Sequence, residues 1–323
     1  MDGALNSKQK PMLMRDAVIN TIYSAAKKDR NIIFISADLG AASLDSFRRE
    51  LPDQFIHAGI SEQNMVDLAS GLALAGKKVF LYAMAPFITA RCYEQVKCVI
   101  ASMNLPITLI GVGVGLGYDH ATLTHFTPED VACMRAINGI EVLSPSDELS
   151  AISMAKEALN NPAFRYIRLE RQVQEILYQD GFSEVLDKGF AHLVEGSDLA
   201  IVACGYMVHK ALRAQMELTT KGISAGVIDL FRLKRVNSIG LTEVLAHYTN
   251  IITVEEQILD GGFGSVVIES LNDQNVLKPT KRLGIKDGFE VLNGDRDALH
   301  NLYEIDTQHI VGAGLELTGT QVA

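Results

Sequence analysis

The residue with the clearest chemical potential is Glu62, which opens a long apolar-periodic stretch. It lies in the segment 60–66, Ile-Ser-Glu-Gln-Asn-Met-Val, and apolar residues then recur at helical spacing from Met65 to Ala75. The pattern predicts that Glu62 sits in the first turn of a helix that buries one face. A glutamate there can simply complement the positive end of the helix. The alternative is a carboxyl group that takes part in acid–base chemistry.

Two further segments place polar or aromatic side chains just after expected strands. Asp38 follows the expected strand 32–36. A carboxylate at a strand's C-terminal end suits the ligand crevice of an open α/β sheet, although a cap or turn Asp is an equal alternative. Phe87 follows the expected strand 79–83. Its ring can offer a flat face to another ring, or it can be an ordinary core residue.

Histidines and arginines complete the set of candidate residues. The glycine-rich loop 115–135 contains His120 and His125, either of which would otherwise be a surface histidine. Arg168 and Arg171 lie in Tyr-Ile-Arg-Leu-Glu-Arg-Gln, and Arg15 lies in the first expected helix. The guanidinium fork can bind two oxygens of a phosphate group, but a surface ion pair is nearly as good an explanation for any one arginine.

These segments together resemble one known family. The stretch from His57 to Gly76 resembles the segment of transketolases and 1-deoxyxylulose-phosphate synthases that carries their cofactor-activating glutamate. The flanking segments resemble the same family in the same order, from about Arg15 to Gly314. The resemblance implies thiamine diphosphate as cofactor, with Glu62 on the pyrimidine N1′. That contact favours the imino tautomer, whose 4′-imine can accept the C2 proton.

The resemblance also implies roles for the other candidate residues. It places Glu62 and His125 as catalytic residues, and it implies cofactor binding by Asp38, Glu62, Phe87 and Arg91. It implies substrate binding by Arg15, His57, His120, His125 and Arg171. Arg171, before Gln172, matches the family's substrate-phosphate arginine, whereas the register of the stacking aromatic residue is open by one position.

The loop before His125 departs from the family pattern. Transketolases typically have Gly-Glu-Asp-Gly before Thr-His, with an Asp four residues ahead of the His. Here that position is Ala121, and Asp119 stands two residues earlier. The usual recognition of sugar hydroxyls is therefore in doubt, and a substrate other than a standard pentose phosphate stays open.

One family domain is missing from the resemblance. Whole transketolases carry a diphosphate-binding domain with a Gly-Asp-Gly motif, whereas the only Gly-Asp here is Gly294-Asp295. The resemblance therefore implies the C-terminal subunit of a split transketolase. The N-terminal subunit would supply the Mg²⁺ ligands, in an expected α₂β₂ heterotetramer.

The implied reaction transfers a two-carbon ketol unit between a phosphorylated ketose and an aldose. The main alternative is the β subunit of a 2-oxo acid dehydrogenase E1 component, which has the same two-domain plan. A non-catalytic paralogue is a third interpretation, which the altered loop keeps open and an intact Glu62 opposes.

Composition excludes several other classes of protein. The chain has 323 residues and a net charge of −10, without a basic cluster long enough for nucleic-acid binding. Its four cysteines have no C-x-x-C spacing, which argues against a zinc site or a disulfide framework and fits a reducing cytoplasm. Residues 1–10 are polar and lack the apolar core of a signal peptide, and no segment is expected to span a membrane.

Two α/β domains are expected to position these residues. Apolar strands separated by helices predict a parallel sheet covered on both faces, that is, a three-layer pyrimidine-binding domain over residues 1–171. Residues 172–194 are expected to link it to a smaller α/β domain of the transketolase C-terminal type over residues 195–323. The expected strands of the first domain are 32–36, 79–83, 107–113, 141–143 and 166–169, and its expected helices are 14–27, 64–75, 91–103, 128–137 and 147–159. In the second domain, strands are expected at 199–203, 226–230 and 251–255, with helices starting at 207, 241 and 264.

Overall fold

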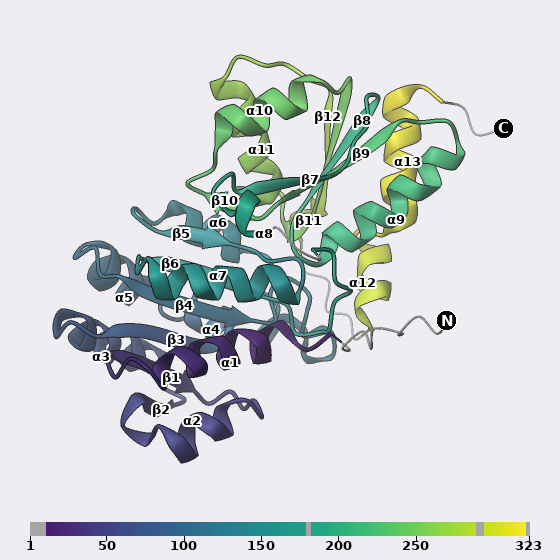
Figure 1. Ribbon diagram of the computed structural model, residues 1–323. Helices are drawn as coiled ribbons and strands as arrows, with labels where there is room; N and C mark the ends of the chain where they lie inside the picture. The colour runs from purple at the N-terminus through teal and green to yellow at the C-terminus, as the bar shows by residue number, and fades with distance from the viewer. Residues whose placement is uncertain (1–10, 179–181, 289–293, 321–323) are drawn as a thin grey trace, which may run out of the picture.

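The computed structural model describes residues 11–178, 182–288 and 294–320. Residues 1–10, 179–181, 289–293 and 321–323 lie outside the described residues. They include the start of the expected first domain, part of the expected linker and the end of the expected second domain. Two α/β units, each with its own sheet, make up the molecule (Figure 1). No helix in the described ranges is long and apolar enough to cross a membrane.

The first unit is built on a mostly parallel sheet. Among the described residues it has seven strands in the order β10-β5-β6-β4-β3-β1-β2. Each neighbouring pair is parallel except β10 and β5. The strands are β1 (Ile32–Ala37), β2 (Phe55–Gly59), β3 (Lys78–Met84), β4 (Ile107–Val112), β5 (Glu141–Leu143), β6 (Arg165–Leu169) and β10 (Arg232–Lys234).

Helices cover both faces of this sheet, as its strand composition predicts. Ile33 and Ile35 of β1 pack into one apolar cluster with residues of α3 (Glu62–Leu74). Ile32 and Phe34 pack into another with residues of α1 (Met14–Ala26) and α7 (Glu148–Asn160). Successive side chains of a strand point to opposite faces, so a continuous apolar strand needs cover on both sides. Figure 1 shows α1 and α7 side by side across one face. The predicted three-layer fold is confirmed.

The helical segments of the first unit alternate with its strands along the chain. The short helix α5 continues directly into the π-helical segment η2. The elements are α1 (Met14–Ala26), α2 (Leu44–Glu50), η1 (Pro52–Gln54), α3 (Glu62–Leu74), α4 (Ala85–Ile88), α5 (Tyr93–Gln95), η2 (Val96–Ala101), η3 (Asp119–Thr124), α6 (Asp130–Ala136) and α7 (Glu148–Asn160).

The second unit contains the other sheet. Within the described residues, its five strands run in the order β12-β11-β8-β9-β7, and β7 is the antiparallel member at one edge. The strands are β7 (Phe190–Val194), β8 (Leu199–Ala203), β9 (Ala225–Leu230), β11 (Asn250–Ile258) and β12 (Thr280–Ile285). The helices are α8 (Phe182–Leu186), α9 (Tyr206–Thr220), α10 (Ser238–Ala246), α11 (Phe263–Asp273), α12 (Arg296–Leu302) and α13 (Thr307–Thr318).

Three local features differ from the sequence prediction. Residues 55–59 form the edge strand β2, which is only half-buried and so lacks the continuous apolar run of the inner strands. The expected helix 91–103 is divided into α5 and η2. The expected linker 172–194 contains α8 and β7, and β7 pairs with β9.

The two units share contacts beyond that segment. β10 lies in sequence between β9 and α10 of the second unit, yet it pairs with β5 of the first sheet. One apolar cluster also runs from β3 and β4 of the first unit to β8 and α11 of the second. The first domain's core is therefore completed by the second.

Candidate active site

The candidate residues collect at one edge of the first sheet. Asp38 follows β1, Glu62 follows β2, Phe87 follows β3 and Arg171 follows β6. These strands are parallel, so their C-terminal ends meet along the same edge. In open α/β sheets, ligands bind in the crevice outside these ends.

Glu62 is a buried carboxylate that forms an ion pair with the partly exposed Arg91, beside an aromatic ring. It is the first residue of α3 and is 4% exposed. The Nη1 of Arg91 donates to its Oε2 at 2.8 Å, and the Arg91 guanidinium lies 3.9 Å from the centre of the Phe87 ring. Burying a carboxylate is costly unless it is paired, and Arg91 provides that pairing. A glutamate that merely complemented a helix end would not need burial or a partner.

Asp38 and His57 form a second, more exposed pair at the ends of β1 and β2. The Nε2 of His57 lies 3.8 Å from Oδ1 of Asp38, and both side chains are about half exposed. The backbone N–H of Gly59 donates to Nδ1 of His57 at 3.2 Å. The neutral imidazole therefore carries its proton on Nε2, which faces Asp38.

The loop after β4 brings His125 to the same place. Its ring centre lies 5.5 Å from that of Phe87 and 5.7 Å from that of Tyr118. The Oγ1 of Thr124 is 2.8 Å from Nδ1 of His125. The Tyr118 ring packs flat against Gly113, where a Cβ atom would come within 1.9 Å of it. Gly113 also has φ +78°, so both backbone and packing require glycine here.

Arg171 also lies beside Tyr118. Its guanidinium is 4.9 Å from the centre of the Tyr118 ring, and its Nη1 is 3.9 Å from Oδ1 of Asp119. Asp119 is 6% exposed, and His120 lies 3.8 Å from it with a largely exposed side chain. The side chain of Arg171 is half-exposed to solvent, whereas the neighbouring carboxylate of Asp119 is buried.

Arg15 approaches the site from α1. Burial raises the pKa of Tyr118, and the charges of Arg171 and Arg15 oppose that rise. Arg15 also lies 3.7 Å from Asp16, and its buried Nε has no hydrogen-bond partner among the described residues. The charges of two arginines, Arg171 and Arg15, therefore act on Tyr118.

Arg168 does not belong to this group. Its side chain is 1% exposed and points into the sheet core, where Nε and Nη2 donate to Asp130 at 2.7 and 3.0 Å. Its Nη1 donates to Ser144, and the hydroxyl of Tyr166 also donates to Asp130. This arginine holds the first domain together, which leaves Arg171 as the arginine of this segment that can meet a ligand.

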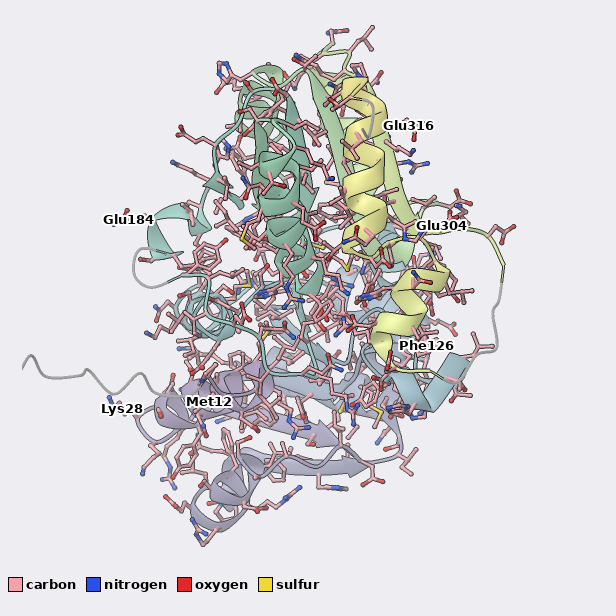
Figure 2. The ribbon with its side chains drawn as sticks, turned by 90° about the vertical axis from the view of Figure 1, so that its right-hand side faces the viewer. Met12, Lys28, Phe126, Glu184, Glu304 and Glu316 are labelled. Atoms are coloured by element: carbon pink, nitrogen blue, oxygen red, sulfur yellow. The ribbon has the colours of Figure 1, made fainter. Side chains whose placement is uncertain are left out.

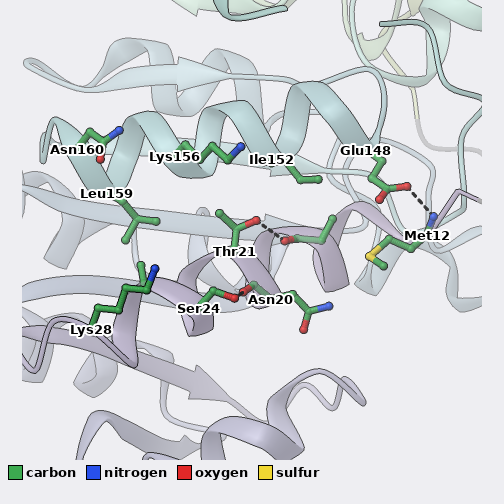
Figure 3. Close-up of a pocket in the computed structure, with 12 residues that line it drawn as sticks. Met12, Asn20, Thr21, Ser24, Lys28, Glu148, Ile152, Lys156, Leu159 and Asn160 are labelled. Atoms are coloured by element: carbon green, nitrogen blue, oxygen red, sulfur yellow. Dashed lines mark hydrogen bonds between the residues drawn. The ribbon is translucent and has the colours of Figure 1, made fainter. Parts of the chain in front are cut away.

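A cavity of about 580 Å³ lies away from this edge of the sheet, between α1 and α7, and contains none of the candidate residues (Figure 3). In the described ranges no group of three or more His, Cys, Asp or Glu side chains could hold a metal ion. The candidate site is therefore recognised by its convergent polar groups.

Sequence reasoning overlooked Tyr118. Its ring lies beside both His125 and Arg171 and contacts Gly113, so it organises the centre of the site. The available signal was an aromatic residue directly after three closely spaced glycines, which predicts a ring packed on bare backbone. Asp119 gave a weaker signal, because its burial depends on contacts distant in sequence.

Comparison with known proteins agrees with this geometry. Residues 10–175 match the transketolase pyrimidine-binding domain, and residues 190–310 match the transketolase C-terminal domain. An apulose-4-phosphate transketolase subunit of Phocaeicola vulgatus is 34% identical over 304 residues, covering 94% of this chain and 96% of the relative. The 1-deoxy-D-xylulose-5-phosphate synthase of Halothermothrix orenii is 33% identical, over 94% of this chain and 48% of that protein.

A solved structure of a transketolase has the same fold as this chain. A split-gene transketolase, described as an inactive β4 tetramer, superposes with a TM-score of 0.84 at 27% identity. The match covers 96% of this chain and 100% of that one. This chain therefore belongs to the transketolase family, in which it corresponds to the C-terminal subunit of a split transketolase.

Proposed function

We propose that this chain is a subunit of a thiamine diphosphate-dependent transketolase that transfers a two-carbon ketol unit between a phosphorylated ketose and an aldose. The observation that carries the proposal is the buried Glu62, held by Arg91 beside Phe87. His125 and Arg171 lie in the same cluster, and each is next to the Tyr118 ring.

The residues present fit the aminopyrimidine of thiamine diphosphate. Arg91 binds Oε2 of Glu62, which leaves Oε1 to share a proton with a ring nitrogen. Phe87 is half-buried and can stack on a planar ring. Arg91 already covers one face of Phe87, so the opposite face is the one that remains for stacking. Asp38, at the C-terminal end of β1, would contact the cofactor as well.

When bound, thiamine diphosphate supplies the carbon nucleophile and electron sink for breaking and forming the C–C bond. Glu62 holds a proton at N1′ of the pyrimidine. His125 exchanges a proton with the substrate carbonyl or hydroxyl, a task suited to imidazole near neutral pH. Arg171 and Arg15 bind the substrate phosphate through charge-assisted hydrogen bonds. His57 and His120 line the substrate side.

A partner subunit would supply the diphosphate-binding domain and the Mg²⁺ ligands, in an α₂β₂ heterotetramer. The Phocaeicola relative is itself named as one subunit of a transketolase, which supports this. In the present chain, Asp295 of the single Gly-Asp pair caps α12 by accepting from the Ala298 N–H at 2.8 Å. That aspartate is occupied as a helix cap. Free cysteines are consistent with a cytoplasmic enzyme.

The two alternatives are less well supported. The similar proteins named above are transketolases and a deoxyxylulose-phosphate synthase, so the E1 β subunit is not favoured. A non-catalytic paralogue would have no reason to keep a carboxyl group buried and paired at the strand ends.

Reconstitution tests the split-enzyme proposal. The purified chain, given Mg²⁺ and thiamine diphosphate, should not turn over a ketose phosphate. Activity should appear when a partner that contains the Gly-Asp-Gly motif is added. Turnover by the purified chain alone would overturn the proposal.

Replacing Glu62 tests its role within the assembled enzyme. Glu62→Ala should lower the rate by about 10²–10⁴, the usual range for a positioned acid–base group, while assembly with the partner persists. Glu148→Ala is the matched control, because Glu148 is also a first-turn glutamate, on α7 outside the site. Wild-type C2 proton exchange in Glu62→Ala would show that this residue only stabilises the helix.

A further inference from the structure

None of the candidate residues described above comes from the second domain, yet a buried arginine within its described residues connects it to the site. Arg296, the first residue of α12, has a side chain that is 3% exposed. Its Nε donates to Oε1 of Glu256 at 2.6 Å, and its Nη2 donates to Oε2 of Glu170 at 2.8 Å. Its guanidinium stacks 3.9 Å from the centre of the Tyr206 ring. The planar guanidinium of Arg296 therefore joins Glu256 of β11 to Glu170, the residue before Arg171.

Glu256 also meets the glycine loop of the site. A Cβ atom on Gly115 would lie 2.7 Å from Oε2 of Glu256 and 2.8 Å from its Cβ. His300 of α12 contacts the same carboxylate through Nε2. Burial alone would raise the pKa of Glu256, but Arg296 and His300 more than offset it and hold the pKa well below its usual range. A charged Glu256 is thus fixed against the backbone that carries Tyr118.

The loop after β4 makes a second set of contacts with the second domain. Leu116 and Phe126 form a buried apolar cluster with Ile285 of β12 and Leu299 of α12, and Figure 2 shows Phe126 beside α12. The backbone N–H of Ile258 donates to the carbonyl of Pro128 at 2.9 Å. Both flanks of the segment that holds Tyr118, Asp119 and His125 therefore rest on the second domain.

We propose that Arg296 is a positioning residue for the substrate side of the active site. Through Glu256 it fixes the loop that holds Tyr118 and His125, and through Glu170 it fixes the backbone next to Arg171. Glu62 lies on α3 and pairs with Arg91, outside this network. Arg296 therefore controls how the substrate is held and leaves activation of the cofactor unaffected. The catalytic part of this inference rests on the proposed function.

Arg296→Lys keeps the charge but removes the fork that reaches two carboxylates at once. In the chain by itself, loop amides should exchange hydrogen faster by about tenfold or more. The reporters are the N–H groups of Gly113, Gly117 and Thr127, which bond to Leu169, Val114 and Gly115 respectively. This measurement needs no activity, so it remains informative if the proposed reaction is wrong.

Kinetics in the assembled enzyme supply the second measurement. Arg296→Lys should raise KM for the sugar phosphate by about tenfold, the loss expected when a charged contact is misplaced. The C2 proton exchange of bound thiamine diphosphate should stay at the wild-type rate. A general loss of structure would lower both substrate affinity and proton exchange.

Arg165→Lys is the matched control. Arg165 is another buried arginine, paired with Glu141 in the first domain, and it does not contact the loop. It should lower thermal stability without changing loop exchange or KM. If Arg296→Lys does not fold, Glu170→Gln tests the same network with one charge removed. Unchanged loop exchange in the folded variant, or equal effects in Arg165→Lys, would overturn the proposal.

Discussion

At the scale of single residues, the environment of Arg171 bears directly on the phosphate-binding role proposed for it. The arginine is half-exposed, but its Nη1 lies 3.9 Å from the buried carboxylate of Asp119. That distance is too long for a hydrogen bond, so the donors of the guanidinium remain available to an anion. Asp119 therefore orients Arg171 and at the same time reduces its net attraction for a phosphate.

Arg171→Ala should weaken binding of a phosphorylated sugar by about 10- to 150-fold, the equivalent of losing a contact of about 1.5–3 kcal/mol. An unphosphorylated analogue should be hardly affected, because it has no anion for the arginine to bind. The comparison is KM for matched sugars with and without phosphate. Arg48→Ala, at an exposed arginine paired with Asp45, is the control. Equal losses on both sugars would assign Arg171 to the fold, and Arg15 would become the next phosphate candidate.

At the scale of elements, the site depends on how the loop leaves β4. Gly113 follows the strand with φ +78°, and Tyr118 folds back onto it. The loop continues as the short helical segment η3, and η3 ends beside His125. The ring of Tyr118 can therefore occupy its position only while residue 113 lacks a side chain.

Gly113→Ala tests this packing. The new methyl group would overlap the Tyr118 ring, so turnover should fall together with stability. Gly76→Ala is the control, because Gly76 has φ +84° but a Cβ atom there would meet no other atom within 4 Å. Both changes should cost about 1–2 kcal/mol through the backbone alone. Chemical denaturation and steady-state kinetics separate the two effects, and normal activity in Gly113→Ala would contradict the packing argument.

At the scale of the whole molecule, the segment after β6 ties the two domains together. The carboxylate of Asp147, which caps α7, accepts the backbone N–H groups of Leu177 and Tyr178, each at 2.9 Å. The hydroxyl of Tyr178 in turn donates to Asp229 of β9 at 2.8 Å. Tyr178 thus bridges an acid of the first domain to an acid of the second.

Asp229 makes this bridge sensitive to pH. Burial raises the pKa of Asp229 from 3.8 to about 7, against hydrogen bonds from Tyr178 and Ser146. The folded protein therefore retains a proton that the unfolded chain loses above pH 3.8. This contribution to stability is complete below pH 3.8 and is lost as the pH rises through about 7.

Asp229→Asn mimics the protonated acid. The loss in the free energy of unfolding between pH 5 and pH 8 should therefore be smaller in the variant than in the wild type, by a few kcal/mol. Glu255, whose pKa burial raises to about 8, leaves a residual slope in both proteins. Urea unfolding midpoints at several pH values measure the difference, and Asp45→Asn on the exposed surface is the control. Parallel pH profiles for wild type and Asp229→Asn would show that Asp229 is ionised in the folded protein.

The sequence by itself determined the fold class and predicted most of the residues of the candidate site. Continuous apolar strands such as 32–36 and 107–112 can be stable only when both faces are covered, so they specify a buried parallel sheet. Because parallel strands end along one edge, Asp38, Phe87 and Arg171 had to converge there. Helical periodicity after Met65 placed Glu62 in a first turn. Each of these conclusions depends on patterns within a few consecutive residues.

Only the tertiary structure decided the remaining contacts. The pairing of β10 with β5, and the contacts of Arg296 with Glu170 and Glu256, join residues about 40 to 130 positions apart, where no local pattern restricts the choice of partner. Arg168 and Arg171 look alike in sequence, yet the first is buried on Asp130 and the second faces the site. Side chains alternate between the faces of a strand, so residues three positions apart can lie on opposite sides of a strand end, and packing determines which one meets the ligand.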